Sequence, residues 1–127
     1  MPVPQLAPVQ QDLVQETLLG EAIEHGPFGV IVLDEAGRYL AANRLACKLS
    51  GYTREELLAG GAKALSFDPS GTEVTMHRMA VGDLQAGTAE LRRKDGSGLT
   101  CEYRLGATRS GGMPFFVVVF WERSEAD

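Results

Sequence analysis

Residues Phe115–Trp121, with the sequence FFVVVFW, constrain the architecture of this chain more than any other segment. An uninterrupted run of β-branched and aromatic residues is typical of a strand that is covered on both faces. The preceding segment, 99–108, alternates between apolar and polar residues, as a strand with one wet face does. Its apolar face carries Leu99, Cys101, Tyr103, Leu105 and Ala107. We therefore expect 115–121 to be an interior strand, shielded by helices on one side and by the N-terminal helix or a second subunit on the other.

Turn and capping residues divide the rest of the chain into elements. Gly37 can adopt a positive φ and favours a hairpin turn after Asp34. Asn43 is a good N-cap, and Thr53 and Glu56 have the spacing of a capping box. The predicted elements are a helix over 10–24, strands over 28–33 and 38–42, helices over 44–50, 53–60 and 70–84, and strands over 88–93, 99–108 and 114–122. Because strands and helices are segregated along the chain, we expect an α+β domain with an antiparallel sheet.

The composition disfavours several classes of protein. The 127 residues are 44% hydrophobic and 23% charged, which is the balance of a soluble globular domain. A net charge of -5 argues against nucleic-acid binding. No apolar run approaches the roughly 20 residues that cross a bilayer, so we expect no direct membrane insertion. Cys47 and Cys101 lack zinc-site spacing and indicate a reduced, cytoplasmic chain. We expect a lead-in and flanking helix over 1–25, the main domain over 26–124 and a tail over 125–127.

Five segments occur in an order that is typical of one protein family. They are the hairpin Phe28–Gly37, the Asn-x-x-Ala run in Ala42–Ala46, the Gly-Tyr-Thr-x-x-Glu-Leu run Gly51–Leu57, the turn Arg92–Ser97 and the final strand Phe115–Ser124. This ordered set covers about residues 22–124 and resembles the PAS (sensory box) family. The resemblance implies a five-stranded antiparallel sheet with short helices on one face and an amphipathic N-terminal flanking helix.

The resemblance also implies a function. In PAS domains the gap between sheet and helices holds heme, flavin, a fatty acid, a carboxylate or nothing. We expect a sensory, signal-transducing homodimer that binds a small molecule there, within a bacterial-type signalling protein such as a two-component system. Its effector domain or partner signalling protein would lie outside this chain. A heme- or flavin-bearing sensor and a ligand-free interaction module are the alternatives, so the cofactor is left open. The sequence contains no nucleophile elbow, phosphate loop or metal-site spacing, so we expect no enzyme.

Candidate ligand-binding residues lie on a helix and on a strand. Val74, His77 and Val81 recur at helical spacing and predict the face of the 70–84 helix that lines the cleft. Heme-binding members use a His on the corresponding helix, but counting back from the later turn places that ligand near Val81, one turn beyond His77. The remaining candidates are Asn43, Cys101, Tyr103 and Leu105. Helix capping is the simpler interpretation for Asn43, and core packing for the strand residues.

Candidate dimer-interface residues lie near both ends of the chain. Apolar positions on the N-terminal helix predict a face that packs on a sheet or on a second subunit. They are Leu13, Val14, Leu18, Leu19 and Ile23. Trp121, near the end of the apolar strand, predicts an anchor for packing or dimerisation, with stacking on a flavin as the alternative.

Overall fold

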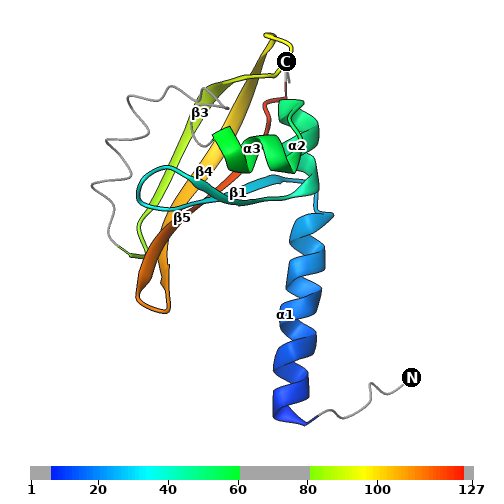
Figure 1. Ribbon diagram of the computed structural model, residues 1–127, viewed down its shortest axis with the longest axis vertical. Helices are drawn as coiled ribbons and strands as arrows, with labels where there is room; N and C mark the ends of the chain where they lie inside the picture. Colours follow the sequence, from blue (N-terminus) through cyan, green and yellow to red (C-terminus); the bar gives the residue numbers. More distant parts are fainter. Residues whose placement is uncertain (1–6, 61–80, 125–127) are drawn as a thin grey trace.

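The computed structural model describes residues 7–60 and 81–124. The elements are helix α1 (Pro8–Glu24), strands β1 (Gly29–Leu33) and β2 (Tyr39–Ala42), helices α2 (Arg44–Ser50) and α3 (Arg54–Gly60), and strands β3 (Leu84–Arg92), β4 (Gly98–Ser110) and β5 (Met113–Glu122). In Figure 1 the strands form one curved sheet with α2 and α3 on one face, while α1 extends away from the sheet as a rod.

The five strands are ordered β2-β1-β5-β4-β3, and every neighbouring pair is antiparallel. The apolar strand β5 therefore lies in the centre, paired with β1 on one side and with β4 on the other. Val118 is opposite Ile31 of β1 and Leu105 of β4, so these three side chains share one face of the sheet. The α+β fold and the interior position of the apolar strand are confirmed.

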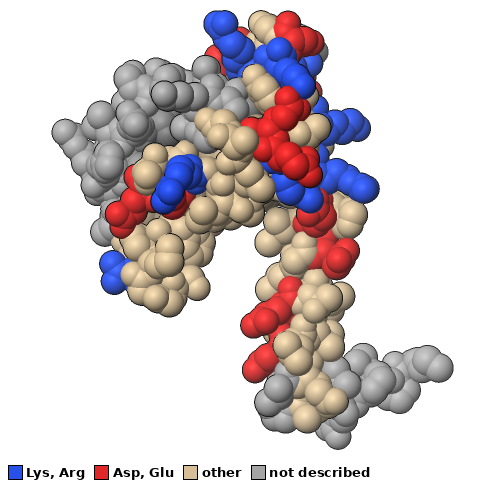
Figure 2. Space-filling model, viewed as in Figure 1, with Lys and Arg blue, Asp and Glu red and all other residues tan. Residues whose placement is uncertain are grey.

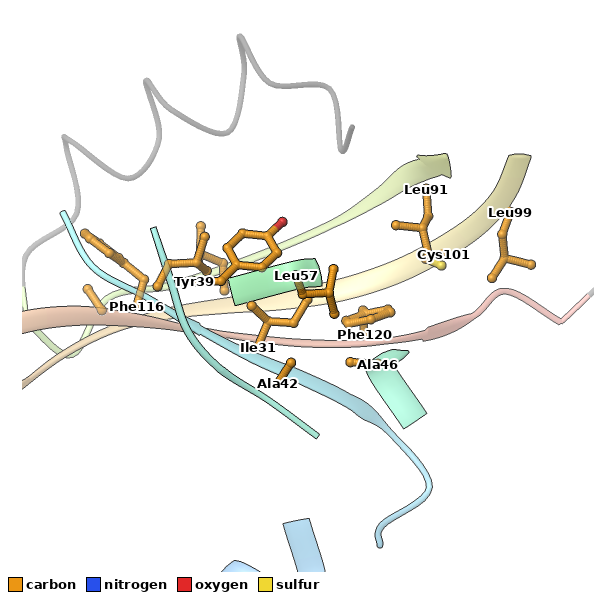
Figure 3. Packing of buried hydrophobic residues seen from close by; sticks show 13 residues of the cluster. Ile31, Tyr39, Ala42, Ala46, Leu57, Leu91, Leu99, Cys101, Phe116 and Phe120 are labelled. Atoms are coloured by element: carbon orange, nitrogen blue, oxygen red, sulfur yellow. The ribbon is translucent and has the colours of Figure 1, made fainter. Parts of the chain in front are cut away.

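The inner face of the sheet, which we define as the face covered by α2 and α3, carries the core. Figure 3 shows Ile31 and Phe120 beside Leu57 of α3 and Ala46 of α2. Leu57, Ala46 and Phe120 have no exposed surface. A Cβ on Gly29 would lie 2.5 Å from the Phe120 ring, so glycine lets the ring lie directly against β1. Burying each large side chain contributes roughly 1.5–3 kcal/mol, which makes this junction the main site of stabilisation.

The opposite, outer face is also apolar but is not covered in the same way. The alternate residues of β1 and β5, whose side chains point away from the inner face, lie here and are all only partly buried. They are Val30, Val32, Phe115, Val117, Val119 and Trp121. The expectation that α1 might cover this face within one molecule is wrong, because α1 points away from the sheet and its apolar side chains are exposed. Within the described residues, α1 therefore does not cover the outer face.

The structure corrects the predicted boundaries between the middle helix and the third strand. β3 begins at Leu84 rather than at Thr88, because Leu84 already pairs with Gly106 of β4. Val81 and Gly82 form a turn, and Gly82 has φ 93°, so the predicted helix does not reach residue 84. Most of that predicted helix falls in 61–80, outside the described residues. Pairing with a neighbouring strand outweighed the helical spacing of apolar residues at this point.

Candidate functional site

Asn43 joins α1, β1 and α2 through a side chain that is fully hydrogen-bonded. Its Oδ1 accepts hydrogen bonds from the amides of Val30 (2.9 Å) and Ala46 (3.0 Å). Its Nδ2 donates to the carbonyls of Ile23 (2.6 Å) and Phe28 (2.8 Å). An asparagine amide has two donors and two acceptor lone pairs, so this set uses all of them. The predicted capping role is confirmed, and no hydrogen-bonding capacity is left for a ligand.

The last turn of α1 is held by a second contact, which we call the α1 latch. One guanidinium nitrogen of Arg54, at the start of α3, contacts both carboxylate oxygens of Glu24 at 2.7 and 3.0 Å. The Arg54 Nε also donates to the carbonyl of Ala42 at 2.9 Å. Together with the bond from Asn43 to Ile23, the α1 latch fixes the direction in which α1 leaves the sheet.

The predicted cleft residues of β4 lie together on the inner face. Cys101 and Leu105 are buried, and Tyr103 between them is partly buried. The Tyr103 ring covers Gly87 of β3, since a Cβ on Gly87 would lie 2.8 Å from the Tyr103 hydroxyl. Burial, reinforced by the nearby Glu122, raises the pKa of Cys101 to about 11. The thiol is therefore neutral at pH 7, which suits packing or contact with an apolar group better than nucleophilic chemistry.

The structure does not confirm the cleft residues that were predicted on the middle helix. Val81 is 59% exposed and lies in the turn before β3, so its predicted place on a cleft-lining helix is wrong. Val74 and His77 lie outside the described residues, and their predicted roles stay predictions. The same holds for His77 as a heme ligand. Cys47 lies on α2, where burial raises its pKa, so it too is a neutral thiol at pH 7.

Trp121 is the centre of a cluster on the outer face, on the far side of the sheet from the inner cleft candidates. Its Nε1 donates to Glu102 at 3.0 Å, and the Arg104 guanidinium lies 5.3 Å from the ring centroid. The Phe28 ring meets it edge-on at 5.5 Å. Sequence reasoning missed Phe28, Glu102 and Arg104. The pairing of β4 with β5 places Glu102 opposite Trp121, and the pairing of β1 with β5, in which Gly29 is opposite Phe120, brings Phe28 beside it.

The apolar positions of α1 form an unoccupied surface. Leu13, Val14, Leu18, Leu19 and Ile23 are all 42–63% exposed. A shallow, largely apolar groove runs along the helix. We call it the α1 groove, and it is lined by Gln11, Val14, Gln15, Leu18, Leu19 and Ala22. Their spacing of three and four residues places them on one helix face, and Leu13 and Ile23 are not among them.

Residues 7–60 and 81–124 contain neither a candidate metal site nor a membrane-spanning helix. No group of three or more His, Cys, Asp or Glu side chains there could hold a metal ion. Nor is any helix in these segments long and apolar enough to cross a membrane.

Comparison with known proteins agrees with the architecture. The family model of the PAS fold matches residues 18–123. A PAS domain of an HTR-like protein from Haloarcula marismortui has a TM-score of 0.78 and 21% identity, over 92% of this chain and 100% of that chain. A PAS domain from a two-component sensor histidine kinase has a TM-score of 0.74 and 17% identity, over 89% and 100%. No curated protein matches the chain significantly.

A third similar structure has a higher sequence identity. It is a domain of a sensory box sensor histidine kinase/response regulator from Geobacter sulfurreducens, with a TM-score of 0.69 and 26% identity. The match covers 84% of this chain and 94% of that chain. Two of the three structures described here thus come from histidine kinases.

Proposed function

Because the chain belongs to the PAS family, we propose that it is a sensory module that dimerises through α1 and the outer face of the sheet and responds to a small molecule on the inner face. The observation that carries the proposal is that one molecule exposes two extended apolar surfaces. One is the α1 groove, and the other is the outer face around Trp121. Contiguous apolar surfaces of this kind are typical of interaction sites.

A second copy of the chain is the partner that fits both surfaces. Pro8–Glu24 contains four acidic residues and no Lys or Arg, so two α1 helices lying side by side repel each other. The outer face instead offers Arg104 above Trp121, with the partly exposed valines of β1 and β5 beside it. α1 of one copy on the outer face of the other buries apolar surface on both and places its acidic side chains near Arg104, while the Glu102 carboxylate on the same face is hydrogen-bonded to Trp121.

Sedimentation velocity over a range of protein concentrations tests the dimer. Leu18→Asp places a charge in the α1 groove and raises the dissociation constant about a hundredfold, since two buried leucines are lost per dimer. Gly20→Asp is the matched control, because it adds the same charge about 160° around α1 from Leu18, at a position with open space around it, and leaves association nearly unchanged. A monomeric wild type, or equal effects of the two substitutions, would falsify the proposed dimer.

The ligand-binding part of the proposal concerns the inner face around Cys101, Tyr103 and Leu105. These residues lie on β4, and the inner face of the same sheet contacts α2 and α3, whose ends hold the α1 latch. A ligand that separates sheet from helices therefore shifts the population of α1 orientations. Native mass spectrometry of the purified chain reveals a retained ligand, and an absorption spectrum identifies heme or flavin. Dimers that gain no ligand from a metabolite extract overturn this part and favour a pure interaction module.

A further inference from the structure

A polar groove at one end of the sheet carries charged groups that have no role in the function proposed above. It is lined by Arg93, Gly98, Leu99, Thr100, Glu122, Arg123 and Ser124. Its volume is about 880 Å³, and it is open to solvent. The groove lies between the β3–β4 turn, the start of β4 and the residues that follow β5. The Arg123 amide donates a hydrogen bond to the carbonyl of Thr100 in β4.

Arg93 is the unusual residue of this groove. Its Nε is buried, yet no atom of the described residues accepts a hydrogen bond from it. A buried donor without an acceptor costs about 1–3 kcal/mol, and more when the group is charged. The Cys101 thiol near Arg93 is neutral because it is buried. The nearby carboxylate is Asp95 in the β3–β4 turn, whose pKa is lowered mainly by hydrogen bonds from Ser97 and partly by the charge of Arg93, but it forms no ion pair with Arg93. Within 7–60 and 81–124, Arg93 therefore lacks the acceptor that a buried guanidinium donor normally has.

The other charged groups of the groove leave room for such an acceptor. Within the described segments, neither Arg93 nor Arg123 is within ion-pair distance of a carboxylate, and Glu122 has no cationic partner. The neighbouring Lys94, by contrast, is paired with Glu56 at 2.6 Å. Two guanidinium groups and one carboxylate give the groove a net charge of +1, with the hydroxyls of Thr100 and Ser124 beside them. Figure 2 shows Lys and Arg side chains gathered with acidic ones at this end of the molecule.

We propose that this groove binds a tetrahedral oxyanion of the phosphate monoester class, held between the side chains of Arg93 and Arg123. Guanidinium groups bind phosphate oxygens through paired, charge-assisted hydrogen bonds, and the terminal nitrogens of Arg93 and Arg123 would form them. A phosphate monoanion also has a hydroxyl that can donate to Glu122 or to the threonine. The bound group would connect the β3–β4 turn to the residues after β5, a link separate from the α1 latch.

Titration of the ¹⁵N-labelled chain at low ionic strength, with sodium phosphate or sodium acetate, tests the site. The Nε–Hε resonance of Arg93 and the amides of Thr100 and Arg123 shift saturably with phosphate. The dissociation constant for phosphate is about tenfold lower than for acetate, because the tetrahedral group engages both arginines. Shifts that stay linear with concentration, or equal affinity for acetate, overturn the assignment.

Matched variants distinguish a specific phosphate-binding site from diffuse electrostatic attraction of phosphate to the surface. Arg93→Gln weakens phosphate binding about tenfold, since it removes a charged donor. Arg92→Gln removes the same charge from the adjacent residue, which is exposed and of opposite parity, and changes affinity less than about twofold. Equal losses in the two variants show diffuse attraction only and refute the site. Arg93→Lys keeps the charge without the planar fork and still weakens binding, which covers the case in which Arg93→Gln does not fold.

The outcome does not depend on the dimer. The same titration in the Leu18→Asp variant gives the same affinity, because the groove and α1 share no residue. A site that survives in a monomeric chain supports the oxyanion proposal even where the dimer proposal fails. A dimeric chain without saturable phosphate binding refutes the oxyanion proposal alone.

Discussion

Replacement of Asn43 is expected to destabilise the chain more than any other single loss of a polar side chain that the structure describes. The substitution Asn43→Ala removes four hydrogen bonds, of 2.6 to 3.0 Å, that tie together α1, β1 and α2. A neutral hydrogen bond contributes about 1 kcal/mol net, and three of these four are only partly buried, so water replaces some of them. We expect a loss of about 3 kcal/mol in the free energy of unfolding. That is a large share of the roughly 5–15 kcal/mol typical of a domain.

The comparison with Asn43→Asp identifies which half of the amide matters. Aspartate keeps the acceptor for Val30 and Ala46, but its second oxygen faces the carbonyls of Ile23 and Phe28 where the wild type has a donor. The pKa of the new carboxyl group is therefore raised in the folded state. Its stabilising contribution is present below the pKa of the unfolded chain and is lost as pH rises through the folded-state pKa. At pH 7 we expect Asn43→Asp to be no more stable than Asn43→Ala.

Urea unfolding at a fixed protein concentration measures both variants, with equal m-values as the check that the same transition is compared. Thr53→Ala is the control, because it removes an N-cap that is exposed. It should cost about 1 kcal/mol. Hydrogen exchange at the amides of Val30 and Ala46 locates the damage. A cost of Asn43→Ala no larger than that of Thr53→Ala, or an Asn43→Asp variant as stable as wild type at pH 7, refutes the four-bond argument.

Three further predictions follow from particular residues. Gly29→Ala places a Cβ 2.5 Å from a fully buried ring and should cost about 2 kcal/mol or more by thermal unfolding, whereas Gly20→Ala, with open space around it in α1, should stabilise by roughly 0.5–1 kcal/mol. Burial works against the ionised form of Asp34, but hydrogen bonds from the following turn lower its pKa overall. The ionised Asp34 therefore stabilises the fold at pH values above its unfolded-state pKa, and this stabilisation is lost as pH falls through its folded-state pKa. In Asp34→Asn, this contribution to the pH dependence of the free energy of unfolding should be absent. Cys101 should resist alkylation by iodoacetamide at pH 8 in the folded chain and react promptly in urea, because burial keeps its thiol protonated; rapid reaction of the folded chain contradicts this.

The sequence predicted elements wherever one local interaction dominates. Asn43 as N-cap and the reciprocal bonds of Thr53 and Glu56 both occur as expected. Each depends on residues within four positions of one another, so their types and spacing suffice. The periodicity that extended a helix to residue 84 was misleading, because β3 is fixed there by pairing with a distant strand. Of the predicted site residues, Val81 was misplaced for the same reason.

What the sequence by itself determined is the alternation and capping that create the elements, and the central place of an apolar strand in the sheet. What only the tertiary structure decided is which distant groups meet. Trp121 gains Glu102 and Arg104 through strand register, and Arg54 reaches Glu24 across thirty positions. Arg93 is left with a buried donor and no acceptor in the described segments. Local backbone preferences depend on neighbouring residues. Strand register, burial and the absence of an ion-pair partner depend instead on how remote segments of the chain pack together.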